Sequence, residues 1–140
     1  MKDEDSDKGA LIGYRLQRAR ETLGDAHLLC DRKGSLWSVI NRAYYAMFYA
    51  VLALLQRIEK VPRKHSGAIA LFDSEFVRKG VFPEALSTHL HRAFAFRQDS
   101  DYHAIKPVSL EDTDELIRNA SSFVETIGAY LKGSTDGQET

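Results

Sequence analysis

Arg97 and His103 stand out on a first reading, because together they offer what the cleavage of a phosphodiester requires. An arginine presents a planar fork of donors that fits two phosphate oxygens. A histidine has an ordinary pKa of about 6.5, so it can take up or release a proton near neutral pH. These residue types could together bind a phosphate group and transfer protons.

The spacing of these two residues sets a condition on the local structure. Five residues separate Arg97 from His103, so along a continuous helix their side chains are rotated by about 240°. They converge only if the helix ends near Asp99 to Asp101 and the chain then turns. Pro107 supports such an ending, because proline disfavours a helical conformation in the residue before it. The alternative is an exposed ion pair between Arg97 and Asp101, which share one helix face.

Other polar side chains are weaker candidates for chemistry. Arg42 is a second candidate for the phosphate site, and its alternative role is to pair with a carboxylate from the first or last helical segment. Asp99 and Asp101 have no neighbours that would complete the shell of a divalent cation. His89 and His91 are two residues apart on a predicted helix and therefore face different ways. We expect no metal site.

Two further features have a plain structural interpretation beside a functional one. His65, at the expected start of the third helix, is expected to cap or to pack. Four basic residues surround the second loop and are opposed only by Glu59; they are Arg57, Lys60, Arg63 and Lys64. This segment could receive a phosphate backbone, or it could be a solvated loop.

Composition excludes several classes of protein. The chain has 140 residues, 19 basic and 20 acidic, so a strongly basic coat for nucleic acid is excluded. The single cysteine excludes an internal disulfide and a cysteine-based zinc site, and it fits a reducing cytoplasm. The polar N-terminus has no signal-peptide pattern. The longest apolar run, residues 43–55, is shorter than the ~20 residues of a membrane span.

Five segments have helical periodicity, and proline or glycine lies between them. We expect helices over residues 7–30, 35–59, 66–80, 83–101 and 109–131. Ser35 and Ser109 are the expected N-caps of the second and fifth helices, and Gly80 is the expected stop of the third. No alternating strand pattern of useful length is present. The sequence therefore predicts an all-α fold.

The second helix is apolar nearly all round, so it must be covered on most sides. It is either the central helix of a monomer or, in addition, the contact with a second subunit. Its aromatic residues, Tyr44, Tyr45, Phe48 and Tyr49, could stack on bases, but at helical spacing they are typical of a core or an interface.

Four stretches of the chain resemble, in order, the motifs of the HEPN domain family. Residues 38–50 read SVINRAYYAMFYA, which is similar to the signature of that family. The other three are YRLQRARETL at residues 14–23, KHSGAIALF at residues 64–72 and RQDSDY at residues 97–102. The resemblance covers nearly the whole chain, from about Gly9 to Leu131.

The resemblance implies a five-helix, up-and-down-type bundle over residues 9–132 that forms a homodimer through its helices, with flexible ends at residues 1–8 and 133–140. Many members are metal-independent ribonucleases, and many act as toxins beside a minimal nucleotidyltransferase antitoxin. Their motif is an arginine, four to six residues and a histidine, two copies of which meet across the dimer. Arg97 and His103 match it and become the catalytic candidates.

The resemblance also places three residues on the substrate side of the site, namely Arg42, Asp101 and Tyr102. Tyr102 is in addition a candidate for adenylylation by the partner. From the sequence we expect no cofactor and no association with a membrane. Gln98 departs from the Asn, Asp or His that commonly follows the arginine. This departure favours the alternative function, a non-catalytic module that binds a nucleotidyltransferase or a nucleotide.

Overall fold

The computed structural model describes the backbone of residues 2–101 and 108–139 and the side chains of residues 6–99 and 108–133. Its elements are α1 (Lys2–Asp31), α2 (Leu36–Arg57), α3 (His65–Phe72), the π-helix η1 (Asp73–Val77), α4 (Glu84–Asp101) and α5 (Leu110–Glu139). These described residues contain no strand, so the predicted all-α fold with five α-helices is confirmed.

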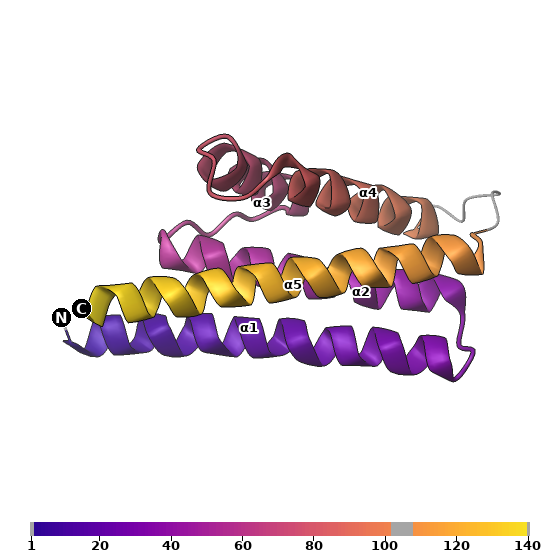
Figure 1. Cartoon of the computed structure of the whole chain (residues 1–140), viewed down its shortest axis with the longest axis horizontal. Coiled ribbons are helices and arrows are strands. Elements are labelled where there is room, and N and C mark those ends of the chain that lie inside the picture. Colours follow the sequence, from indigo (N-terminus) through magenta and orange to yellow (C-terminus); the bar gives the residue numbers. More distant parts are fainter. Residues whose placement is uncertain (1, 102–107, 140) are drawn as a thin grey trace.

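The long helices run up and down along one axis (Figure 1). α1 and α5 span the length of the molecule, α2 runs antiparallel to α1, and α3 with α4 covers the remaining side. α1 and α5 extend beyond their predicted limits, to Lys2 and Glu139. The division into a domain of residues 9–132 with flexible ends stays a prediction.

Local sequence signals fix several helix ends. Ser109 caps α5 as predicted, since its Oγ accepts a hydrogen bond from the amide of Asp112 at 3.0 Å. Ser35 lies at the N-cap of α2, but its side chain makes no capping hydrogen bond. Gly80 stops the third helical segment with φ of 77°, a left-handed conformation that glycine adopts without strain.

The third helix differs from the prediction in its interior. The expected single helix over residues 66–80 is instead α3 followed by η1, in which the amide of Arg78 bonds to the carbonyl of Asp73 at 2.8 Å. A π-turn holds one residue more than an α-turn. Phe72 and Phe76 are buried on either side of this change, so tertiary packing selects it.

α2 is the central helix of the bundle and contacts α1, α3, α4 and α5. Most of its side chains are buried, among them Tyr44, Met47 and Leu54. By length and composition α2 could cross a membrane, but 67% of its most apolar window is buried inside the fold, as in a core helix. Half-exposed side chains remain along one line of α2, at Arg42, Tyr45 and Tyr49.

A cluster of aromatic rings joins the α3–η1 segment to α5. The Phe72 ring lies 5.4 Å from that of Phe123 and 5.9 Å from that of Phe82, measured between centroids. Tyr130 closes the cluster in an edge-on arrangement, with its ring centroid 5.2 Å from that of Phe82. Phe72 and Phe123 have no exposed surface. Burial of these rings fixes α3 and η1 on the long helices.

Replacing Phe72 by alanine should lower the free energy of unfolding by about 3–5 kcal/mol, because a buried ring is lost and a cavity remains. Urea unfolding followed by circular dichroism measures this loss, and Phe72→Leu should lose less. Leu28→Ala is the control, because Leu28 is 55% exposed and its truncation should change little. Equal losses in Phe72→Ala and Leu28→Ala would contradict the packing described here.

Candidate functional site

The predicted catalytic pair falls on α4 and on the segment after it. Arg97 lies near the end of α4, whose described span ends at Asp101. Tyr102 and His103 lie outside the described residues, as does the side chain of Asp101. The geometry of the site is therefore built from Arg97 and the side chains around it.

Arg97 is half-buried against α2, where tyrosine rings hold its guanidinium. Its Cζ lies 5.8 Å from the ring centroid of Tyr45 and 5.9 Å from that of Tyr44. One Nη donates a hydrogen bond to the hydroxyl of Tyr45 at 3.4 Å. Cation–π contact between a guanidinium and an aromatic ring is attractive. The tyrosines therefore position a cation at the junction of α2 and α4.

Arg42 approaches the same ring from α2. Its Cζ lies 5.4 Å from the centroid of Tyr45. Its Nε and Nη2 donate to Oδ1 of Asn41, at 3.0 and 2.7 Å. The predicted pairing with a carboxylate of the first or last helix is wrong, because the neighbouring amide takes those donors. Arg42 also lines a surface pocket of about 320 Å³ with Trp37, Ser38 and Asn41.

Tyr44 and His65 form a hydrogen bond beneath Arg97. The hydroxyl of Tyr44 lies 2.7 Å from Nδ1 of His65. The imidazole stacks on Phe48, with 4.0 Å between ring centroids and planes 3° apart. Burial raises the pKa of Tyr44, which Arg97 partly opposes, so the phenol stays protonated. His65 thus packs at the start of α3, as the sequence predicted.

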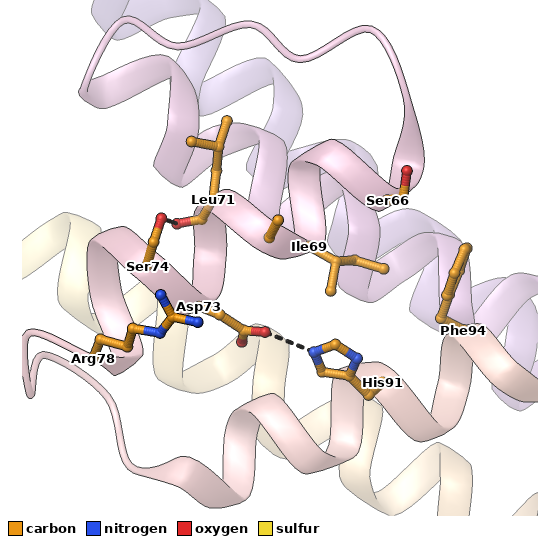
Figure 2. A pocket seen from close by; sticks show the side chains of 9 residues that line it. Ser66, Ile69, Leu71, Asp73, Ser74, Arg78, His91 and Phe94 are labelled. Atoms are coloured by element: carbon orange, nitrogen blue, oxygen red, sulfur yellow. Dashed lines mark hydrogen bonds and ion pairs between the residues drawn. The ribbon is translucent and has the colours of Figure 1, made fainter.

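A pocket of about 420 Å³ lies between α3, η1 and α4, beside this network (Figure 2). Its floor is apolar and includes Phe94. On its polar side Asp73 accepts two hydrogen bonds, each 2.7 Å long, from Nε2 of His91 and from the hydroxyl of Ser87. Figure 2 shows Arg78 directed toward the same carboxylate. The pocket is lined by residues of the α3–η1 segment and of α4, which are far apart in sequence. No local sequence pattern therefore indicated it.

The basic second loop is partly neutralised. Lys60 pairs with Glu75 of η1 at 3.1 Å, and Lys79 pairs with the same carboxylate at 2.6 Å. Hydrogen bonds from Lys79 and Lys60 lower the pKa of Glu75. The charge of this loop therefore takes part in a surface ion-pair network, which weakens the interpretation as a phosphate site.

Tyr44→Phe should lower the free energy of unfolding by about 1–2 kcal/mol, because the part-buried hydrogen bond between Tyr44 and Nδ1 of His65 is lost. Urea unfolding measures the loss. Tyr130→Phe is the matched control, since within the described residues the hydroxyl of Tyr130 makes no hydrogen bond. If both variants were as stable as the wild type, the hydrogen bond between Tyr44 and His65 would not contribute to the stability of the fold.

Comparison with known proteins adds to this geometry. The family model of the HEPN domain matches residues 12–130. The chain is 38% identical over 127 residues to a UPF0332 protein of Thermotoga maritima, with 91% of this chain and 96% of the relative covered. It is 43% identical over 118 residues to a UPF0332 protein of Pyrococcus horikoshii, with 84% and 77% covered. A protein of Methanocaldococcus jannaschii named "Putative toxin MJ0142" is 32% identical over 107 residues, with 72% and 73% covered.

Proposed function

Because the chain belongs to the HEPN domain family, we propose that it is a toxin-type, metal-independent RNA endonuclease. The names of two relatives from Methanocaldococcus jannaschii support the toxin class. The observation that carries the proposal is the pair of guanidiniums at one ring. Arg97 and Arg42 lie 5.8 and 5.4 Å from the centroid of Tyr45, on two different helices. Asn41 accepts the hydrogen bonds of Nε and Nη2 of Arg42, so a phosphate beside Tyr45 would receive hydrogen bonds from Arg97 and from Nη1 of Arg42.

The reaction would use the substrate's own 2′-hydroxyl. His103 would take the proton from this hydroxyl as its oxygen attacks the neighbouring phosphorus, or would protonate the 5′-oxygen as the P–O5′ bond breaks. The second copy of His103, in a homodimer, would fill the other role. Arg97 would stabilise the charge that develops on the phosphate oxygens. The products are a 2′,3′-cyclic phosphate and a free 5′-hydroxyl.

The remaining residues of the predicted site take substrate-side and regulatory roles. Arg42 binds phosphate from α2, while Asp101 and Tyr102 flank the scissile position. The partner is a minimal nucleotidyltransferase antitoxin in the cytoplasm, which covers the site or modifies Tyr102. A homodimer would bring two copies of this site together.

A non-catalytic partner module is the second candidate. Gln98 favours it, because active members commonly carry Asn, Asp or His at this position. In that role the dimer would bind the nucleotidyltransferase or its nucleotide and would leave RNA intact. The two functions differ in a single observable, the cleavage of RNA by the protein freed of its partner.

Purified protein should cleave single-stranded RNA in the presence of EDTA. His103→Ala should lose two to four decades of rate, the usual range for a general acid or base, and Arg97→Ala should be similarly impaired. Gel analysis of a labelled oligonucleotide measures the rate and identifies the cyclic phosphate. Absence of cleavage by the free wild type, or unchanged cleavage by His103→Ala, would favour the partner module.

Arg92→Ala is the matched control for Arg97→Ala. Arg92 also lies on α4 with its guanidinium over a ring, 5.6 Å from the centroid of Phe96. It differs in its ion pairs, which run to Asp112 at 3.9 Å and Glu115 at 3.4 Å. Its truncation should leave cleavage unchanged, so a loss in both variants would indicate a general effect of removing an arginine from α4.

The homodimer has a test of its own. Light scattering at high micromolar concentration should give twice the mass of 15.8 kDa. A monomeric wild type would contradict the homodimer. It would also contradict a site that two subunits share.

A further inference from the structure

We propose that Arg15 and Arg18 of α1, with Tyr49 of α2, form a second phosphate-binding subsite, so that a single RNA strand lies along α2 away from the cleavage site. The inference rests on the proposed function and deepens it, since it names the residues that bind the strand outside the scissile position. Arg15 and Arg18 lie in the stretch of residues 14–23 and Tyr49 lies in the stretch of residues 38–50, but the resemblance assigned these three residues no role.

Arg18 and Tyr49 repeat the contact that Arg97 makes with Tyr45. The Cζ of Arg18 lies 5.0 Å from the ring centroid of Tyr49, and its Nη2 donates to the Tyr49 hydroxyl at 3.3 Å. In both cases a guanidinium from a flanking helix lies over a half-exposed tyrosine of α2. α1 supplies the cation on one side of α2 and α4 supplies it on the other.

The spacing of the two units fits a nucleic-acid backbone. Tyr45 and Tyr49 are four residues apart, which is about 6 Å along a helix axis, and their ring centroids are 5.9 Å apart. The two Arg–Tyr units are therefore neighbours along α2, as a strand that follows this helix requires. The parts of these rings that the guanidiniums leave uncovered would add apolar contact area for bases without regard to their identity. An Arg–Tyr unit repeated at this period therefore suits a polyanion better than an isolated ligand.

These cations have no carboxylate partner in the part of the chain that the structure describes. No acidic side chain there lies within ion-pair distance of Arg15, Arg18 or Arg42. Within the same residues the Nε of Arg15 is buried and has no acceptor. Arg15 precedes Arg18 by three positions, so the two share a side of α1. Arg92 shows the contrast, since acidic partners neutralise it on another face.

The decisive measurement is binding of a cleavage-resistant strand. The probe is a labelled 12-nucleotide 2′-O-methyl oligouridine, which lacks the attacking hydroxyl, and anisotropy gives the affinity at several salt concentrations. Arg18→Gln should bind about tenfold more weakly, the usual effect of one charge-assisted hydrogen bond. It should also reduce the slope of log affinity against log salt by about one. Arg15→Gln should act in the same direction, and Arg92→Gln should match the wild type.

Three outcomes separate this inference from the proposed function. If the wild type cleaves RNA while Arg18→Gln binds the probe with the wild-type affinity and salt slope, the subsite is refuted and the nuclease stands. If the wild type cleaves no RNA while Arg18→Gln loses affinity as expected, the subsite stands and the nuclease is refuted. If Arg18→Gln changes the mass in light scattering but not the affinity, the surface is a contact between subunits and the subsite is refuted.

Discussion

The structure depends on the need to bury α2. A helix that is apolar on nearly every side has to be covered, and α1, α3, α4 and α5 do this together. They leave one line open, where tyrosines take the place of aliphatic residues. A tyrosine at such a position buries its ring and keeps its hydroxyl and part of one face accessible. Arg18, Arg42 and Arg97 come to lie on exactly those tyrosines, so the core packing also decides where the cations are.

The helices could be predicted from the sequence because their signals are local. Ser109 and Gly80 act at the positions where they stand, and the apolar run of α2 marks the centre of the bundle without reference to any other segment. The π-turn at Asp73–Val77 could not be predicted, because it depends on how Phe72 and Phe76 are buried against distant parts of the chain. The absence of a side-chain cap at Ser35 has no local signal either.

In the candidate site, too, some features could be predicted from the sequence and others could not. Arg97 could be found from a short motif, but the partners of Arg42 could not, since an adjacent amide and a distant carboxylate are equally compatible with its position. The contact between Arg18 and Tyr49 could be predicted from the sequence, because Arg18 lies 15 residues before Lys33 and Tyr49 lies 15 residues after Gly34. Two antiparallel helices joined by that turn bring such positions opposite each other. The hydrogen bond between Asp73 and His91 could not be predicted from the sequence, because it depends on how η1 and α4 pack in the fold.

The π-turn has a consequence for how this segment can change during evolution. In an uninterrupted helix, inserting one residue rotates everything after it by about 100° and breaks every contact on one side of the insertion. Here the extra residue is absorbed within a single turn, and Gly80 ends the segment shortly afterwards. The part before the turn and the part after it can therefore keep independent rotational settings. Relatives that differ in length by one residue between Phe72 and Gly80 would keep the same bundle while reshaping the pocket beside Asp73.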